Sequence, residues 1–359
     1  MTAPYILHGL KQSYFTGKME AYLRVKGVPF DFVIMDSGDF RDCGRATGVL
    51  QMPQLQVPDG SWLTDTTAII RHFESALPAP ALQPATPVGL FLSRFVEDAA
   101  DEWLWRPALY YRWAFVEDSR LMGRQLGRDM LSDQPGPLAL RAWWIRARQR
   151  RMFLGHDGVT PLTAPQVEAV YKETLDALEP VFAARPFLFG ERPVGADFGL
   201  FGPMFRHFFS DPTPAAIMRE RAPNVLAWVT RLWALTPEAA ARAPLPADAP
   251  ADLDPFLRLA AGDHLTELAA NHEAVAAGRP RAEFDHRGVR WSLPVSPYRA
   301  RCLRDLRTDY EALSEAERVT IDSRLGPASA HLKGPVTELP AATAPRPGNR
   351  PIDRRWRRW

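Results

Sequence analysis

The sequence has few cysteines and almost no net charge. Only Cys43 and Cys302 are cysteines among 359 residues, and they form neither a CxxC pair nor a metal-ligand spacing. We therefore expect no disulfide framework and no metal, and we predict a cytoplasmic location. Lys and Arg number 44 against 42 Asp and Glu, for a net charge of +2. That balance gives no general attraction to nucleic acid or to an acidic membrane.

Long hydrophobic runs are also absent. No apolar stretch approaches the roughly 20 residues that a membrane-spanning helix needs. The start, MTAPYILHGLKQ, lacks the basic segment and long apolar stretch of a signal peptide. We therefore predict a soluble protein without a membrane span. Proline is abundant, with 34 residues, many of them in predicted connections.

The length suits two domains and an additional segment. Strand and helix patterns alternate at first, and helical patterns dominate after a proline-rich linker. A basic end, RRWRRW, follows a Pro- and Ala-rich stretch and is predicted to be disordered. The predicted parts are a mixed domain at 1–78, a linker at 79–87, an all-helical domain at 88–240, a partly helical extension at 241–334 and a disordered tail at 335–359.

The first domain has the predicted order β, α, β, then β, β, α. YILHGL predicts a strand, KMEAYLRVK a helix ended by Gly27, and PFDFVIMD a second strand. QMPQLQVPDGSWLTD predicts a hairpin with its turn at Asp59-Gly60. DTTAIIRHFESAL predicts a helix capped by Asp65 or Thr66. In the second domain, LFLSRFVEDAADEWLWRPALYYRWAF predicts one long helix that Pro107 bends.

The stretch MPQLQVPDGSWLTDTTAIIRHF resembles a signature of the glutathione S-transferase superfamily. The matching positions are Met52, Pro53, Leu55, Asp59, Gly60, Leu63, Asp65, Thr66, Ala68 and Ile69. The resemblance implies an α+β fold, with an N-terminal thioredoxin-fold domain followed by an all-α helical domain and, here, a C-terminal extension. The aromatic DEWLWRPALYYRW and the extension also resemble bacterial and metaxin- or Fax-like branches of the superfamily.

A second match, FLFGERPVGADFGLFGP, resembles the family's folding motif before a long buried helix. Val194 departs from that pattern, because a Ser or Thr usually stands there as the cap opposite Asp197. The hydroxyl half of the capping box is therefore missing. This departure bears on local stability more than on function.

The resemblance implies a glutathione-binding site. Its predicted residues are Gln51, Met52, Pro53, Asp65 and Thr66. If the Met52-Pro53 peptide is cis, as in the family, the Met52 backbone offers an extended edge to the cysteinyl unit of glutathione. The helix start at Asp65-Thr66 suits the γ-glutamyl end, since free N–H groups and a positive dipole lie there.

The stretch SYFTGK follows the first strand and contains the predicted catalytic residue. Ser13 matches the family's catalytic position, and its hydroxyl at a helix start can stabilise the glutathione thiolate. Thr16 is held in reserve for this role, and Ser13 as a helix cap alone is the competing interpretation. We expect Lys18 to be a solvated helix charge.

Other polar and aromatic residues give weaker indications. The predicted pocket for an electrophile comprises Tyr14, Tyr110, Tyr111 and Trp113, although aromatic residues at such spacing more often belong to a core. Cys43 is a minor candidate for a reactive thiol. His207 is expected to be buried and hydrogen-bonded.

The sequence therefore favours a glutathione transferase that joins glutathione, as co-substrate, to a small hydrophobic electrophile, with a role in detoxification. By resemblance it would form a homodimer. The alternative, from another class, is a non-catalytic protein of the same fold that serves as a scaffold or binds a partner.

Overall fold

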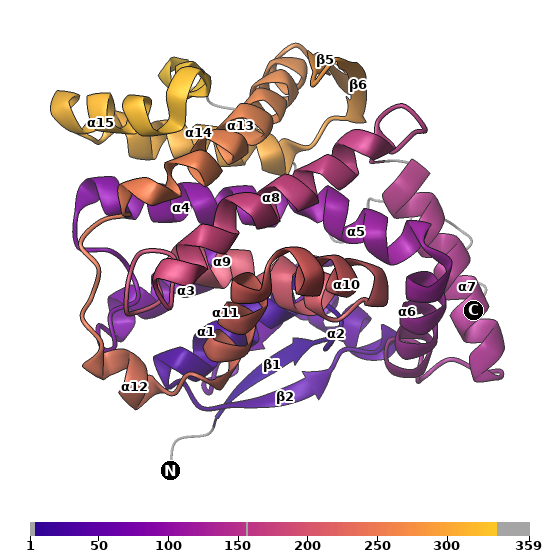
Figure 1. The fold of residues 1–359 in the computed structure, drawn as a ribbon. Helices are drawn as coiled ribbons and strands as arrows, with labels where there is room; N and C mark the ends of the chain where they lie inside the picture. Colours follow the sequence, from indigo (N-terminus) through magenta and orange to yellow (C-terminus); the bar gives the residue numbers. More distant parts are fainter. Residues whose placement is uncertain (1–3, 156, 336–359) are drawn as a thin grey trace.

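The computed structural model describes residues 4–155 and 157–335. Figure 1 shows a small sheet at the bottom of the molecule, a layer containing α4, α8 and α5 across its middle, and α13, α14 and α15 at the top. The predicted tail at 335–359 lies outside the described residues except for Pro335. Within the described ranges, no helix is long and apolar enough to cross a membrane.

The N-terminal part is a mixed four-stranded sheet with helices. Its elements are β1 (Tyr5–Gly9), α1 (Tyr14–Lys26), β2 (Phe30–Ile34), α2 (Ser37–Thr47), β3 (Gln54–Gln56), β4 (Trp62–Thr64) and α3 (Thr66–Ala76). The strand order is β2-β1-β3-β4, with β1 parallel to β2 and antiparallel to β3. The predicted strands and the helices α1 and α3 follow one another along the chain as expected, whereas α2 was not predicted. The arrangement confirms a thioredoxin-like domain.

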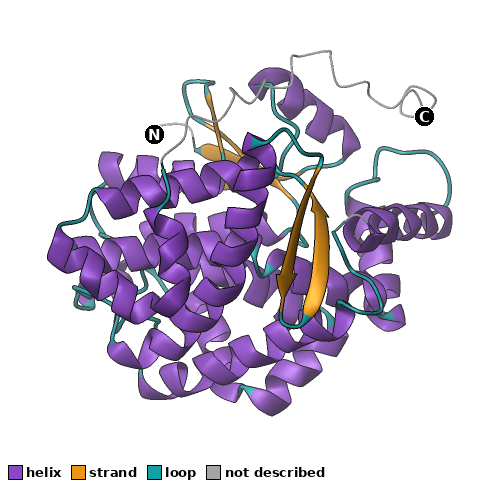
Figure 2. Ribbon diagram, turned by 90° about the horizontal axis from the view of Figure 1, so that it is seen from above, coloured by secondary structure: helices purple, strands orange, loops and turns teal. Residues whose placement is uncertain are grey.

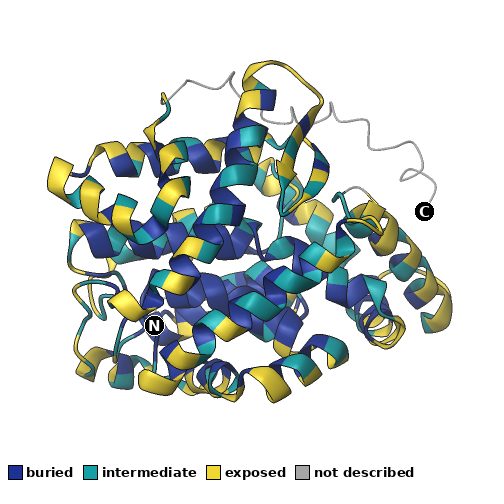
Figure 3. Ribbon diagram, turned by 45° about the horizontal axis from the view of Figure 1, so that its top comes forward, coloured by how far each residue is buried: buried dark blue, intermediate teal, exposed yellow. Residues whose placement is uncertain are grey.

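The helical part follows from residue 87. It contains α4 (Pro87–Glu102), α5 (Trp105–Ala114), α6 (Val116–Asp129), α7 (Leu138–Arg150), the π-helical turn η1 (Arg151–Gly155), α8 (Ala164–Ala184), α9 (Gly195–Pro203), the π-helical turn η2 (Met204–Phe209), α10 (Pro212–Arg221), α11 (Pro223–Ala234) and α12 (Pro237–Arg242). Figure 3 shows that buried residues concentrate where these helices face one another.

The aromatic stretch predicted as one long helix is in fact two helices. The chain turns at Trp103 and Leu104, between α4 and α5. Pro107 lies in the first turn of α5, where a missing N–H costs no helical hydrogen bond. Pro107 therefore stands near the start of a second helix and does not bend a continuous one.

The start of α9 keeps half of a capping box. The buried Asp197 carboxylate accepts hydrogen bonds from the N–H groups of Val194 (3.0 Å) and Leu188 (2.9 Å) and from Nε1 of Trp228 (3.2 Å). Burial raises the pKa of Asp197 to about 7, even though these donors act in the opposite direction. Val194 has no side-chain acceptor to complete the box, and the three donors to Asp197 hold this helix start in place.

The extension folds over the helical part as further helices and a hairpin. Its elements are η3 (Ala251–Leu253), α13 (Asp254–Ala276), β5 (Arg281–His286), β6 (Val289–Pro294), α14 (Pro297–Glu311), α15 (Glu315–Leu325) and η4 (Gly326–Lys333). Viewed from above in Figure 2, the antiparallel β5–β6 hairpin lies across the helices. The helices α13, α14 and α15 all pack against α4. One hydrophobic core runs from Leu7 to Leu332, so the extension shares the core of the two preceding parts.

Candidate functional site

The sheet register brings the predicted site residues to one end of the sheet. His8, near the end of β1, pairs with Gln54, the first residue of β3, and Gln54 pairs with Thr64, the last residue of β4. The segments after β1, before β3 and after β4 therefore leave the sheet at the same end. These three segments contain the predicted catalytic residue and the predicted glutathione-binding residues.

Ser13 is the N-cap of α1. Its backbone is extended, and its Oγ accepts a hydrogen bond from the Thr16 N–H at 3.3 Å. The side chain is half-buried, and its hydroxyl donates to no residue in the described parts of the chain. A lone pair on Ser13 Oγ therefore caps the helix, while the Ser13 O–H stays available to donate to another acceptor. The cap interpretation and the catalytic interpretation are compatible in this geometry.

Arg112 on α5 holds the loop that leads to Ser13. Its guanidinium donates to the Gln12 carbonyl at 2.7 Å and to the Asp211 carboxylate at 2.7 and 2.9 Å. All three residues are buried. Burial raises the pKa of Asp211 to about 6, although the neighbouring Arg112 acts to lower it. A buried arginine with this set of partners fixes the loop against the helical part.

The two neighbours of Ser13 that were considered for the site face the core. Thr16 is fully buried against Gly9, where an added Cβ would lie 2.6 Å from the threonine side chain. The Tyr14 ring packs edge-on against Trp105, and its hydroxyl donates to the Ala100 carbonyl. Burial raises the pKa of Tyr14 well above its ordinary value. Neither hydroxyl lies at the exposed side of the helix start, where Ser13 is.

Lys18 is not a solvated helix charge, and that prediction was wrong. The side chain is fully buried and pairs with Glu97 at 2.7 Å and Asp101 at 2.5 Å, both on α4. Its ammonium also donates to Thr67 Oγ1 at 3.3 Å. Burial alone would lower the pKa of Lys18, but the two carboxylates outweigh it and raise the pKa above its ordinary value. Lys18 thus ties α1 to α4 and to the start of α3.

The segment before β3 leaves a stretch of backbone without a partner. The Met52-Pro53 peptide is cis. The Gln51 carbonyl accepts a hydrogen bond from Gln54 Nε2 at 3.2 Å. Across the described ranges, the N–H and C=O of Met52 make no hydrogen bond. That backbone can therefore pair with an extended ligand.

Asp65 caps α3 in an unusual backbone conformation. Its φ is 71°, a left-handed value that costs energy for a residue other than glycine. Its Oδ1 accepts from the N–H groups of Thr67 (3.1 Å) and Ala68 (3.5 Å), while Oδ2 faces the extension. Thr66, the first residue of the helix, is buried. A residue held in this conformation at a helix start is typical of a binding site.

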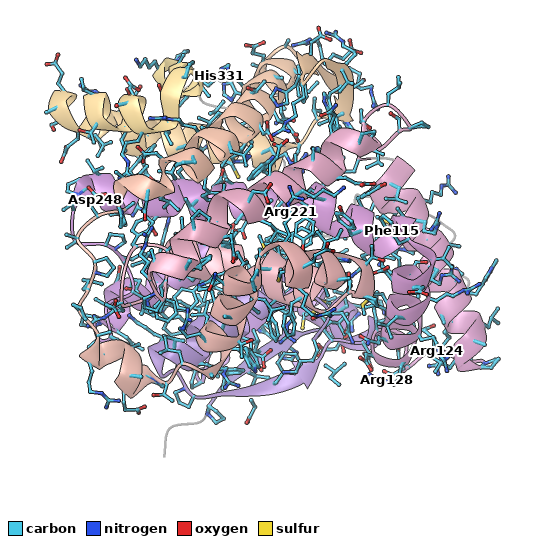
Figure 4. All side chains as sticks on the ribbon, in the orientation of Figure 1. Phe115, Arg124, Arg128, Arg221, Asp248 and His331 are labelled. Carbon is cyan, nitrogen blue, oxygen red and sulfur yellow. The ribbon has the colours of Figure 1, made fainter. Side chains whose placement is uncertain are left out.

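The residues predicted for an electrophile pocket do not share one surface. Tyr111 and Trp113 are almost fully buried in the core. Tyr111 stacks on Phe115, which Figure 4 labels at the junction of α5 and α6. The Tyr110 hydroxyl donates to Glu168 at 2.9 Å, and burial raises the pKa of Tyr110 to about 12. The structure therefore places these aromatic rings in the packing of the helical part.

A different apolar group, absent from the sequence-based set, lies beside the start of α1. Phe15 stacks on Trp105 with a centroid distance of 5.7 Å, and Trp105 meets Phe153 edge-on at 5.7 Å. Met52 packs, partly buried, in the same cluster as Trp105 and Phe153. Phe15 was adjacent to Ser13 in the sequence, but Trp105 and Phe153 come from segments that only the fold brings together.

Cys43 lies in a small polar cluster within the N-terminal domain. Its Sγ donates weakly to Asp39 at 3.7 Å, and His8 Nδ1 lies 2.9 Å from the same carboxylate. Burial, followed by the charge of Asp39, raises the pKa of Cys43 to about 12. Such a thiol stays protonated at neutral pH, which disfavours a nucleophilic role. His207 is buried as predicted, with Nδ1 3.1 Å from the Ala108 carbonyl.

Comparison with protein families gives two matches. Residues 7–81 match the N-terminal domain of glutathione S-transferase, and residues 151–235 match its C-terminal domain. The chain belongs to the glutathione S-transferase superfamily. Residues from 236 onward, which include the whole extension, lie outside both matched ranges.

Solved structures of this superfamily are similar to the chain. A glutathione S-transferase from Methylobacterium radiotolerans, in complex with glutathione sulfonate, is 21% identical over 68% of this chain and 95% of its own, with a TM-score of 0.41. The beta-etherase LigF from Sphingobium sp. strain SYK-6 is 20% identical over 67% of this chain and 97% of its own, with a TM-score of 0.47. A comparison with curated proteins finds no match. The family assignment rests on the two domain matches.

Proposed function

We propose that this protein is a glutathione transferase that binds glutathione and stabilises its thiolate for attack on a small electrophile. The observation that carries the proposal is the start of α3. There Asp65 is held at a φ of 71°, at the same end of the sheet as the unpaired backbone of Met52 and the free hydroxyl of Ser13. A tripeptide with a zwitterionic end, a peptide backbone and a thiol requires these three kinds of partner.

The binding half of the proposal assigns one part of glutathione to each group. The cysteinyl backbone pairs with Met52 as an added strand would. The γ-glutamyl carboxylate lies at the N-terminus of α3, near Thr66, where the helix dipole favours a negative charge. The ammonium lies beside the Asp65 carboxylate. Gln51 borders this segment, although its carbonyl is already engaged by Gln54.

The catalytic half rests on Ser13. Its O–H donates to the glutathione sulfur and favours the thiolate, which lowers the thiol pKa from its free value of about 8.5. The thiol proton passes to solvent, the thiolate forms a carbon–sulfur bond with the electrophile, and the leaving group departs with the bonding electron pair. Ser13 forms no covalent bond. The apolar side chains of Met52, Trp105 and Phe153 suit a hydrophobic acceptor.

A turnover assay on the full chain tests this proposal, with wild type and Ser13→Ala compared on a panel of small electrophiles and glutathione affinity measured in parallel. We expect wild type to turn over at least one electrophile. Loss of one hydrogen bond to a charged sulfur should reduce turnover by about 10- to 100-fold and leave glutathione affinity nearly unchanged. Glutathione binding without turnover would favour the non-catalytic alternative, and full activity of Ser13→Ala would remove Ser13 from the mechanism.

We also propose that the protein acts in the cytoplasm, in detoxification, as a homodimer. The assembly proposal rests on family membership alone. The extension covers α4 and leaves less of that helix available to another chain. A molecular-mass measurement in solution therefore tests whether the protein is a dimer.

A further inference from the structure

A charged cavity lies between the N-terminal domain and the extension. Its volume is about 260 Å³, and its walls come from α3, α4 and α14. Asp65, at the start of α3, is one of its lining residues. Because α14 belongs to the extension, this cavity exists only in a chain that has the extension folded against α4.

The Asp65 carboxylate is bonded to α14 through its second oxygen. Arg301 Nη2 lies 3.1 Å from Asp65 Oδ2, and the Tyr298 hydroxyl lies 3.4 Å from the same atom. The Arg301 guanidinium also lies over the Tyr298 ring, 4.6 Å from its centroid. The Arg301 side chain is 46% exposed and that of Asp65 is 24% exposed. The pair is therefore held in place yet open to a ligand.

The wall of the cavity carries both signs of charge, with five carboxylates and three arginines among its lining residues. Each of its carboxylates has a basic partner within 3.1 Å: Asp65 with Arg301, Glu97 with Lys18, Asp98 with His264, Asp305 with Arg304, and Asp309 with Arg94. A cavity that presents both signs of charge, with an excess of carboxylates, favours a zwitterion over a phosphate or another net anion. An α-amino acid group, with one ammonium and one carboxylate, has that character.

α14 is fixed firmly enough to act as a binding wall. Arg299 pairs with Glu102 on α4 at 2.9 Å and with Glu267 on α13 at 2.8 Å. The start of the helix is capped by Ser296, whose backbone groups are bonded to Asn271 on α13. Neighbouring Arg301 and Tyr298 are thereby presented from a rigid element, as a preorganised site requires.

We propose that Arg301 and Tyr298 complete the γ-glutamyl subsite from the extension. Arg301 adds a contact to the α-carboxylate of the ligand, which the N-terminus of α3 also attracts, while Asp65 binds its α-ammonium. The zwitterion then lies antiparallel to the Asp65–Arg301 ion pair. Tyr298 is a positioning residue that holds the guanidinium over its ring. This inference rests on the proposed function, since it names the residues that recognise one end of glutathione.

The chemistry of Arg301 and Asp65 supports the assignment of the ligand carboxylate to the first and of the ligand ammonium to the second. A guanidinium presents a planar fork that can bind a ligand carboxylate and still keep one bond to Asp65. Asp65 Oδ1 serves the helix cap, so Oδ2 is the oxygen that faces the ligand. Oδ2 keeps its bond to Arg301, and the ligand ammonium takes the place of the longer contact with the Tyr298 hydroxyl. The ligand therefore adds to an existing pair and does not have to break it.

The test crosses protein variants with ligand analogues in calorimetry on the full chain. The ligands are glutathione, γ-aminobutyryl-cysteinyl-glycine, which lacks the α-carboxylate, and glutaryl-cysteinyl-glycine, which lacks the α-ammonium. The proteins are wild type, Arg301→Ala, Arg301→Lys and the control Arg290→Ala. Arg290 is an exposed arginine on β6 that pairs with Glu283 and Asp285. Arg290→Ala removes one positive charge, as Arg301→Ala does.

We expect Arg301→Ala to weaken glutathione binding about tenfold, the loss of one charge-assisted contact. The same variant should bind γ-aminobutyryl-cysteinyl-glycine as wild type does, and it should still discriminate against glutaryl-cysteinyl-glycine. Arg301→Lys should restore part of the affinity, and Arg290→Ala should match wild type. An unchanged unfolding midpoint would show that Arg301→Ala is folded.

Two results would overturn the inference alone. One is unchanged glutathione affinity in Arg301→Ala, and the other is an equal loss for glutathione and the decarboxylated analogue, which would indicate a merely structural role. Failure of wild type to bind glutathione at all would overturn the proposed function and this inference with it. The outcomes are thus distinguishable in one set of titrations.

Discussion

At the scale of single residues, a group's role depends on partners that lie far away in the chain. Ser13 was identifiable as a helix cap from SYFTGK, because the start of a helix after a strand can be recognised from local sequence. The burial of Lys18 was not, because its partners Glu97 and Asp101 lie on a helix some 80 residues later. The same applies to Arg112, whose partner Asp211 lies 99 residues away. Local patterns reveal a charged residue but not whether its counter-charge is buried with it.

Lys18 gives the sharpest stability prediction. Lys18→Met keeps a side chain of similar length but leaves two buried carboxylates without their cation, which should cost about 3–5 kcal/mol of unfolding free energy. Lys172→Met is the matched control, since Lys172 is partly exposed and its pair with Glu168 lies within one helix. It should cost less than about 1 kcal/mol. Chemical denaturation of both variants measures this, and equal losses would contradict the account.

At the scale of elements, the sequence predicted the N-terminal domain well. The four strands, the helices α1 and α3, the hairpin after Met52 and a cap of α3 at Asp65 or Thr66 all followed from periodicity, turn residues and capping. The helix α2 was missed. The break between α4 and α5 was missed because Trp103 and Leu104 occupy the turn, with no glycine or proline there to indicate one. The helix is interrupted there for tertiary reasons, with Trp103 buried and bonded to Asp263 on α13.

The apolar side of the site was also unpredictable at this scale. Tyr110, Tyr111 and Trp113 stood out as an aromatic run, yet helical periodicity cannot tell a core face from a cleft face. Trp105 and Phe153, which lie with Met52 beside the start of α1, are separated by 48 residues and two intervening helices. Only the packing of α5 against η1 places them together.

At the scale of the whole molecule, charged residues join the extension to the rest. Glu267 on α13 accepts from Arg106 on α5 at 2.9 Å and from Arg299 on α14 at 2.8 Å. Burial alone would raise the pKa of Glu267, but the two arginines outweigh burial and lower it from 4.5 to about 2. The sequence predicted helices in this region without indicating that they would be fixed to α5 in this way.

The pH dependence of stability follows from that lowered pKa. Because the folded pKa lies below the unfolded one, Glu267 contributes stability above about pH 4.5, and the contribution is lost as the pH falls toward 2. The lowering corresponds to on the order of 3 kcal/mol at neutral pH. Glu267→Gln should therefore be destabilised at neutral pH and should lose stability less steeply than wild type in acid.

Denaturation curves measured across this pH range check the prediction. Glu283→Gln on the exposed hairpin is the control, and its curve should parallel that of wild type. If the stability of Glu267→Gln and of wild type changed with pH in parallel, the Glu267 carboxylate would not stabilise the packing of the extension.

The proposed mechanism requires that the protein lower the thiol pKa of bound glutathione through Ser13. The most direct measurement is a pH titration of the ultraviolet absorbance of the thiolate in the glutathione complex, for wild type and Ser13→Ala. We expect a pKa clearly below the free value of about 8.5 in wild type and a return toward that value in Ser13→Ala. A bound thiol that titrates at the free value in wild type, or equally low in both proteins, would contradict this mechanism.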